Sequence, residues 1–177
     1  GRSPRATRDN CSGPICSNSP TGDTPGTAWF SLPKVFELRA RETALFGKWH
    51  LGRNDEGLPW QLTPQLHGFD STFDVVPGNV AAECSGFAGD YDDWLCVENG
   101  VSFVEHRYHT LELRDDFIAW WSGTLGPKFA MVSFQAAHAP FDEPPPELLP
   151  PLPPAGPRRT PSRIQYEELI ISLGTAL

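Results

Sequence analysis

A lysine and a histidine two residues apart, Lys48 and His50, are the side chains best suited to chemistry in this sequence. They follow the apolar run Thr43–Phe46, which predicts a short buried strand, and Gly47, where the backbone can open. Side chains two apart in an extended chain point the same way, so we expect Lys48 and His50 to share one face and Trp49 to turn into the fold. A fixed cation beside an imidazole suits an anion that must be held and must gain or lose a proton.

The spacing of this pair alone also fits a surface lysine beside a histidine at the edge of the core. A second unit of helix and strand repeats this arrangement. Leu111–Leu125 has the apolar spacing of a helix, Gly126-Pro127 interrupts it, and Lys128–Phe134 is expected to be a buried strand. The strand ends at Gln135, and His138 follows. Sites in open α/β sheets gather at the carboxyl ends of strands, so His138 is a further candidate.

The other elements predicted are short. Ser31 is expected to cap a helix from Leu32 to about Arg41, with an apolar side formed by Val35, Phe36 and Leu38. Residues 53–65 are expected to form a loop, and Gly68–Val76 a short strand or turn. Val101–Val104 should pair in a hairpin after the turn at 98–100, and Ser162–Leu177 should be the last helix.

Two segments lack an apolar period. Residues 1–31 are rich in Gly, Pro, Ser, Thr and Asn and predict an irregular loop. Residues 141–161 are dominated by proline and predict an extended, polyproline-like connector. The aromatic residues of the loop region 77–99 are expected to pack onto the core rather than line a substrate-binding rim: Phe87, Tyr91 and Trp94.

Length, charge and hydropathy argue against several classes of protein. The chain has 177 residues, which is one domain's worth. A net charge of -8 argues against a nucleic-acid surface. No run of about 18 apolar residues is present, so no membrane span is predicted. The start at Gly1 without a methionine or a signal-peptide pattern indicates processing or truncation.

The four cysteines leave two interpretations open. Cys11–Cys16 and Cys84–Cys96 are the local choice among three disulfide connectivities, and four thiols are the alternative. Their spacing gives weak support to a zinc site.

Three sequence words resemble those of the sulfatase family, in the family's order. Ala44–Gly52 resembles the signature in which a strand delivers a Lys-x-His pair, His67–Asp70 is similar to the "GFD" turn, and Phe134–Pro140 is similar to the "H-x-P" strand end. The resemblance covers nearly the whole chain. It implies an α/β fold with a mixed, mostly parallel sheet flanked by helices, as in the alkaline-phosphatase superfamily. Residues 1–177 would then be a single partial catalytic domain.

The resemblance also implies a mechanism and a site. A formylglycine made from Cys or Ser attacks the sulfur of a sulfate ester, Lys48 binds a sulfate oxygen, His50 is the base that collapses the sulfo-enzyme hemiacetal, and His138 helps to protonate the leaving oxygen. No C-x-P-x-R nucleophile signature occurs in the sequence, and Gly1-Arg2 looks like the tail of that element. We therefore expect this chain to be an internal fragment of a sulfatase domain, and we expect the fragment to lack catalytic turnover.

Calcium is the cofactor that the resemblance implies for the full-length protein, with ligands that are not in this chain. The sequence assigns no metal ligand, and tight calcium binding would point to Asp90, Asp92 and Asp93. Asp115 and Asp116 are expected in the first turn of the helix 111–125, where they favour the helix dipole. Adjacent helical residues do not face each other, which argues against a shared metal.

The expected partner is a small-molecule or carbohydrate sulfate ester. The family and the even cysteine count favour a secreted, periplasmic or lysosomal-type compartment. Two alternatives stay open: a phosphohydrolase of the same superfamily, against which the Lys-x-His pair counts, and a non-catalytic binding module formed by the proline-rich segment and the aromatic loop.

Overall fold

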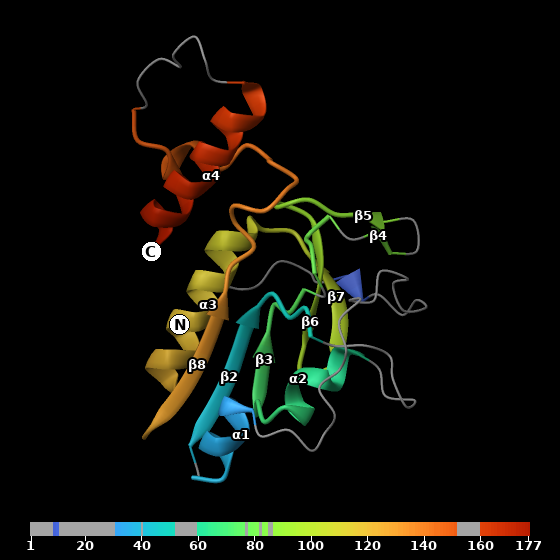
Figure 1. Cartoon of the computed structure of the whole chain (residues 1–177), viewed down its shortest axis with the longest axis vertical. Coiled ribbons are helices and arrows are strands. Elements are labelled where there is room, and N and C mark those ends of the chain that lie inside the picture. Colours follow the sequence, from blue (N-terminus) through green and yellow to red (C-terminus); the bar gives the residue numbers. More distant parts are fainter. Residues whose placement is uncertain are drawn as a thin grey trace.

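A parallel sheet lies at the centre of the computed structural model, which describes residues 9–10, 31–39, 41–51, 60–76, 78–81, 83–84, 87–151 and 160–177 (Figure 1). Its strand order is β3 (Ser71–Phe73), β2 (Glu42–Gly47) and β8 (Lys128–Ser133), and both pairings are parallel. The sequence of β2 is apolar on both faces, as is typical of a central parallel strand. Leu45 and Phe46 are both fully buried and point to opposite faces.

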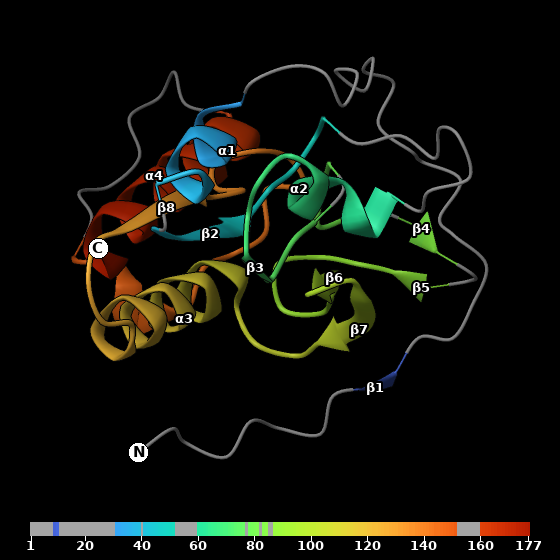
Figure 2. The same ribbon diagram turned by 90° about the horizontal axis from the view of Figure 1, so that it is seen from below.

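Helices cover the two faces of this sheet (Figure 2). On one face, Phe46 packs with Leu113 of α3 (His109–Gly123). On the other face lies α1 (Leu32–Glu37), whose Phe36 stacks on Phe129 of β8 with 4.7 Å between ring centroids. The chain therefore has the α/β fold with a mostly parallel sheet that the sequence predicts.

An antiparallel hairpin forms a second sheet. It consists of β6 (Trp94–Glu98) and β7 (Val101–Glu105), and β1 (Asp9–Asn10) pairs with the other edge of β7. The turn uses Asn99 and Gly100, with φ of 48° and 85°, as a two-residue hairpin turn requires. This confirms the predicted hairpin. A small antiparallel pair, β4 (Glu83–Cys84) and β5 (Phe87–Ala88), precedes it.

The first helix begins as predicted and ends early. Ser31 is the N-cap of α1 and its Oγ accepts a hydrogen bond from the Lys34 N–H at 3.4 Å. The helix stops at Glu37, and Val35 and Leu38 are exposed, so the predicted apolar side is wrong except for Phe36.

Part of the loop predicted over 53–65 is helical. Residues 52–59 lie outside the described part, but Trp60–Leu62 forms a 3-10 turn (η1) and Thr63–Leu66 a short helix (α2). The Thr63 hydroxyl ties this turn and helix to the core. It donates to the carbonyl of Trp60 and accepts from the indole Nε1 of Trp49 at 2.9 Å. Trp49 is buried, as the alternation argument predicts.

The helix α3 begins two residues earlier than predicted, at His109. Glu112 is therefore the acidic residue of the first turn, and Asp115 and Asp116 lie in the second turn. The expectation that both aspartates interact with the dipole in the first turn is wrong.

The strand β8 differs in burial from the prediction. It was expected to be buried, but most of its side chains are only half-buried and Met131 is 40% exposed. The reason is its position, because within the described residues β8 pairs with β2 and with no strand on its other edge. An apolar strand at an edge is open to further pairing.

The last helix, α4 (Pro161–Ala176), is capped by the Thr160 side chain, which accepts from the Arg163 N–H at 3.3 Å. Leu169 is fully buried, while Ile170 is 46% exposed. Residues 152–159 of the proline-rich connector lie outside the described part, and its first half contains one 3-10 turn (η2, Pro146–Leu148). Among the described residues, no helix is long and apolar enough to cross a membrane.

The aromatic residues of the region 77–99 pack as predicted where they are described. Tyr91 and Trp94 are fully buried, and the side chain of Phe87 lies outside the described part. Cys96 is buried in β6. Its sulfur forms no disulfide, so the predicted Cys84–Cys96 bridge is wrong. Cys11 and Cys16 lie outside the described part, so their pairing stays a prediction.

A buried histidine should make the fold sensitive to acid. His109 is fully buried against Trp94, and burial lowers its pKa from 6.5 to about 3. Below pH 6.5 the unfolded chain therefore binds a proton that the folded chain does not bind, so the free energy of unfolding falls as the pH falls toward 3. The contribution is up to about 1.4 kcal/mol per pH unit.

We predict that His109→Phe removes this contribution. Urea unfolding should show that the free energy of unfolding falls between pH 7 and pH 5 by about 2 kcal/mol more in the wild type than in the variant. Any constant packing cost of the larger ring cancels in this difference. His50→Gln, a change at an exposed histidine, is the control, and an equal loss in wild type and His109→Phe would contradict the prediction.

Candidate functional site

The segment after β2 is fixed between the ends of its two neighbours. The three parallel strands place their carboxyl ends at one edge, with Phe46 beside Phe73 and Gly47 beside Ser133. The backbone N–H of Lys48 then donates to the Ser133 carbonyl at 2.9 Å, and that of Trp49 to the Val76 carbonyl at 3.0 Å. The Lys-x-His pair is thus held by backbone hydrogen bonds on both sides.

The glycine before the pair is required by this packing. Gly47 has φ of 82°, and a Cβ there would lie 2.3 Å from the Ser133 carbonyl oxygen and 2.9 Å from the Leu113 side chain. No L side chain fits at that position. Gly47 therefore lets the chain turn from β2 into the pair while it stays close to β8.

Lys48 carries a half-buried ammonium group that has no carboxylate partner among the described residues. Burial lowers its pKa from the ordinary value. A partly desolvated cation without a counter-ion attracts an anion more strongly than a solvated one does. This is the feature expected of a residue that binds an anionic group.

The two histidines both lie near the segment that follows β3. His50 is exposed, and a Cβ on Gly78 would lie 3.4 Å from its Nε2. The next residue, Asn79, donates from Nδ2 to the Ala139 carbonyl at 2.9 Å. That carbonyl also lies 2.7 Å from Nδ1 of His138. His50 and His138 are thus each close to one residue of the short segment 78–79.

Sequence reasoning missed the residues that make this connection. Asn79 also accepts a hydrogen bond from Nε2 of Gln135 at 3.2 Å, and the Tyr91 hydroxyl donates to the His138 carbonyl at 2.9 Å. None of these belongs to a recognisable motif. The alternation of side chains along a strand cannot identify them, because Asn79 and Tyr91 lie in irregular segments.

The acidic residues named for a calcium site have other roles. Oδ1 of Asp90 accepts from the backbone N–H groups of Asp92 and Asp93, both at 2.8 Å. Asp93 Oδ1 also lies 2.5 Å from Nδ1 of His106. Burial, followed by the charges of Asp90 and Asp142, raises the pKa of Asp92. These contacts describe an acidic loop closed on its own backbone.

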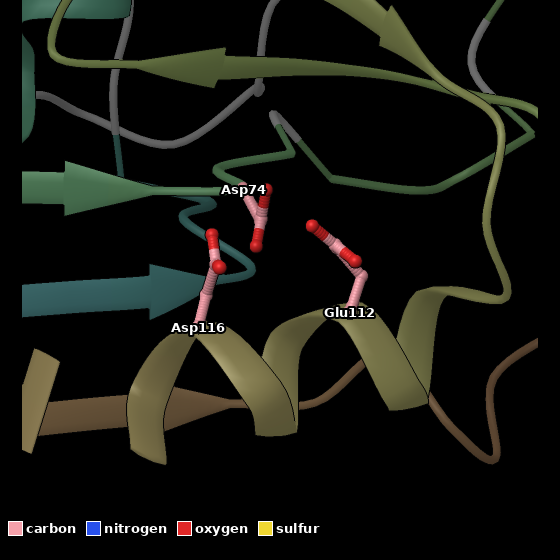
Figure 3. Close-up of side chains that lie close together, drawn as sticks. All are labelled: Asp74, Glu112 and Asp116. Atoms are coloured by element: carbon pink, nitrogen blue, oxygen red, sulfur yellow. The ribbon is translucent and has the colours of Figure 1, made fainter. Parts of the chain in front are cut away.

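Three other carboxylates come together where none was expected (Figure 3). Asp74, at the end of β3, faces Glu112 and Asp116 of α3, and ligand atoms of all three lie within 4.8 Å of one another. All three side chains are buried. The signal in the sequence was the spacing of Glu112 and Asp116, four apart on the buried face of one helix.

One member of this triad already has a cationic partner, because Arg107 Nη1 contacts Oε2 of Glu112 at 2.6 Å. The carboxylates alone would not complete a calcium site, whose six to eight oxygen ligands also include backbone carbonyls and waters. Burial, and then the charges of Asp116 and Glu105, raise the pKa of Glu112 against the opposing effect of Arg107. Glu112 therefore tends to retain its proton.

No family model matches the chain. Two crystal structures of Ps i-CgsB, an i-carrageenan sulfatase, resemble it, one of them in complex with k-i-k-neocarrahexaose. Each comparison has a TM-score of 0.61 at 17% sequence identity and covers 92% of this chain. This chain has part of a sulfatase-like fold. It spans 39% of the length of Ps i-CgsB.

Sulfate binding tests the site without requiring turnover. We predict that inorganic sulfate shifts the backbone NMR signals of residues 48–50 and 135–138, and that Lys48→Ala weakens this binding roughly tenfold to a hundredfold, since a hydrogen bond to a charged group contributes about 1.5–3 kcal/mol. Lys128→Ala is the control, because Lys128 Nζ binds the Thr124 carbonyl at 2.6 Å at the other end of β8. Equal weakening by both substitutions would refute a specific role for Lys48.

The triad should cost stability once it ionises. Since the pKa of Glu112 is raised above 4.5, the folded chain binds more protons than the unfolded chain as the pH rises past this value, and stability falls. We predict that Asp116→Asn raises the free energy of unfolding at pH 7, measured by urea denaturation, because it removes a charge that raises the pKa of Glu112. Added calcium should leave the melting temperature unchanged.

The neighbouring Asp115→Asn is the matched control. Burial raises the pKa of Asp115, but hydrogen bonds from Arg107 and Arg114 outweigh it and lower the pKa, so this substitution should destabilise the chain at pH 7. A calcium-dependent rise in melting temperature that Asp116→Asn abolishes would contradict our interpretation and assign a cation to the triad.

Proposed function

We propose that this chain is part of a sulfuric ester hydrolase that cleaves sulfate monoesters. The observation that carries the proposal is Lys48, a half-buried ammonium at the carboxyl end of the central strand, with no carboxylate partner among the described residues. His50 follows two residues later. The likeness to Ps i-CgsB over 92% of the chain supports the same conclusion, although only through the fold.

Lys48 is proposed to bind a sulfate oxygen. A compact point charge fits a tetrahedral anion, and its partial burial strengthens the interaction with charge that develops in the transition state. The backbone N–H of Lys48 donates to the Ser133 carbonyl at 2.9 Å, which fixes the main chain from which the lysine side chain extends. This is the contribution expected of a residue whose loss lowers the rate rather than the affinity alone.

The two histidines are proposed to move protons at opposite stages. His138 would give a proton to the leaving alcohol oxygen, and His50 would accept the proton that must depart when sulfate is released. Both side chains are exposed, so a substrate can reach them. Each lies near one residue of the short segment 78–79, and we propose that they serve different oxygens of one ester.

The nucleophile is proposed to lie outside these 177 residues, because they contain no C-x-P-x-R sequence. A formylglycine there would supply the oxygen that attacks sulfur. Calcium is proposed for the full-length protein on the basis of the family resemblance, with ligands outside these 177 residues.

A sulfated carbohydrate is the substrate class that we favour. Ps i-CgsB was crystallised with a neocarrahexaose, and the exposed position of both histidines suits an ester carried on a large molecule. Assay of aryl sulfate against aryl phosphate with the full-length protein separates this proposal from a phosphohydrolase. Hydrolysis of the phosphate alone would overturn it.

Lys48→Ala in the full-length protein should depress hydrolysis of a sulfate ester on the order of a hundredfold or more, the usual cost of removing one stabiliser of the transferring group. Most of the loss should appear in kcat. Lys128→Ala should retain the wild-type rate. A Lys48→Ala enzyme within a fewfold of wild type would remove Lys48 from the mechanism.

His50→Ala should instead separate the two halves of the reaction. If His50 accepts the proton that departs with sulfate, its loss should allow one burst of alcohol product and then leave sulfate on the enzyme. Intact-protein mass spectrometry after exposure to substrate should show this retained mass. Near-normal steady turnover with no retained sulfate would make the Lys-x-His pair a structural coincidence.

A further inference from the structure

Two consecutive backbone carbonyls in the loop after β8 are each held by a side chain from a distant segment. The Tyr91 hydroxyl donates to the carbonyl of His138 at 2.9 Å. Nδ2 of Asn79 donates to the carbonyl of Ala139, also at 2.9 Å. The backbone N–H of His138 donates to the Gln135 carbonyl at 2.8 Å. The main chain around His138 is thus fixed at three points, although the imidazole itself is exposed.

One of these carbonyls determines where the imidazole carries its proton. Nδ1 of His138 lies 2.7 Å from the Ala139 oxygen, and a carbonyl can only accept a hydrogen bond. Nδ1 must therefore be the donor. In the neutral ring this leaves Nε2 with the lone pair, on the side of the ring away from the Ala139 carbonyl.

The orientation of the Asn79 amide follows from its neighbours. Oδ1 accepts from the backbone N–H of Ala81 at 3.3 Å and from Nε2 of Gln135 at 3.2 Å, and Gln135 is only 2% exposed. The N–H of Ala81 can only donate, so Oδ1 faces it and Nδ2 faces the Ala139 carbonyl. Asn79 therefore donates to the same oxygen that accepts from His138.

Tyr91 is equally well defined. Its side chain is fully buried, its ring stacks on Tyr108 at 5.8 Å between centroids, and its backbone N–H donates to Oδ2 of Asp142 at 3.2 Å. Burial raises the pKa of Tyr91 well above its ordinary value. The hydroxyl therefore keeps its proton at neutral pH and donates a hydrogen bond to the His138 carbonyl.

We propose that Asn79 and Tyr91 are positioning residues that hold His138 as the Nδ1–H tautomer, so that Nε2 is the nitrogen that meets the substrate. The tautomer of His138 is inferred from the contacts of this chain alone. That Nε2 meets a substrate rests on the proposed function. Neither residue touches the ester; both act through the carbonyls of residues 138 and 139.

The tautomer matters for proton transfer. In the protonated ring, the Nε2–H bond breaks as an O–H bond forms on the leaving oxygen, and the ring is left neutral with its remaining proton on Nδ1. That product is the form that the Ala139 carbonyl stabilises, so no rearrangement of the loop follows the transfer. With the opposite tautomer, the lone pair of Nδ1 would face the carbonyl oxygen, and the two would repel.

Nitrogen-15 NMR of the imidazole groups in the 177-residue chain, at a pH where the rings are neutral, tests the tautomer directly. His138→Gln identifies the His138 signals by their loss. We expect one form in the wild type, with the proton on Nδ1. In Tyr91→Phe and in Asn79→Ala we expect loss of that single form and signals averaged between the two tautomers.

Tyr108→Phe is the matched control, because Tyr108 is an adjacent buried tyrosine whose hydroxyl faces Ser172 of α4, 3.5 Å away. It should leave His138 in the Nδ1–H form. A wild-type signal with the proton on Nε2 would overturn the proposal even if every variant failed to fold. So would folded Tyr91→Phe and Asn79→Ala variants that both keep the wild-type tautomer.

Kinetics of the full-length protein separate this inference from the proposed function. Tyr91→Phe should lower kcat roughly tenfold with little change in KM, the usual cost of losing a partner that orients a functional histidine. Absence of any sulfate ester hydrolysis in the wild type would refute the function while the tautomer result stood. Normal kcat in a Tyr91→Phe enzyme that has an altered tautomer would refute the positioning role.

Discussion

The candidate site depends on the parallel pairing of β2 with a strand on each side. A central strand is the only kind whose carboxyl end is flanked by two other carboxyl ends, and the backbone bonds of Lys48 to Ser133 and of Trp49 to Val76 extend this pairing beyond the strand. The main chain of the segment is therefore fixed by the sheet. Gly47 is part of the same constraint, because the close approach of the Ser133 carbonyl excludes any side chain there.

The other end of β2 is fixed by a side chain from the "GFD" turn. Oδ2 of Asp70 accepts from the Thr43 backbone N–H at 2.8 Å and from its hydroxyl at 2.7 Å. Gly68 has φ of 92°, and a Cβ there would lie 2.5 Å from the backbone nitrogen of Lys34. This sequence word is therefore structural in this chain: it anchors the start of the strand whose other end carries Lys48. A motif can mark a fold without contributing a side chain to the chemistry.

Periodicity predicted the features that depend on local rules. The strand at Thr43–Phe46, the burial of Trp49, the cap at Ser31 and the hairpin turn at Asn99 all follow from neighbours within a few residues. What could not be predicted depends on register or on distant segments. A shift of two residues at the start of α3 changed the role of Asp116, because the face a helical residue presents is set by the packing of the whole helix. The contacts of Asn79 join segments 56 and 60 residues apart, which no local pattern encodes.

An acidic chain can offer an anion site only if its carboxylates are occupied elsewhere. Several of the carboxylates in the described part meet fixed donors: Asp70 binds Thr43, Asp90 binds the backbone of its own loop, Asp115 binds Arg107 and Arg114, and Asp142 binds the Tyr91 N–H. Glu112 on α3 forms a salt bridge with Arg107, so its charge is also paired. The ammonium of Lys48 meets no such group in the same part of the structure. The net charge of -8 therefore describes the whole sequence, whereas the potential at the end of β2 depends on the charges that lie near it.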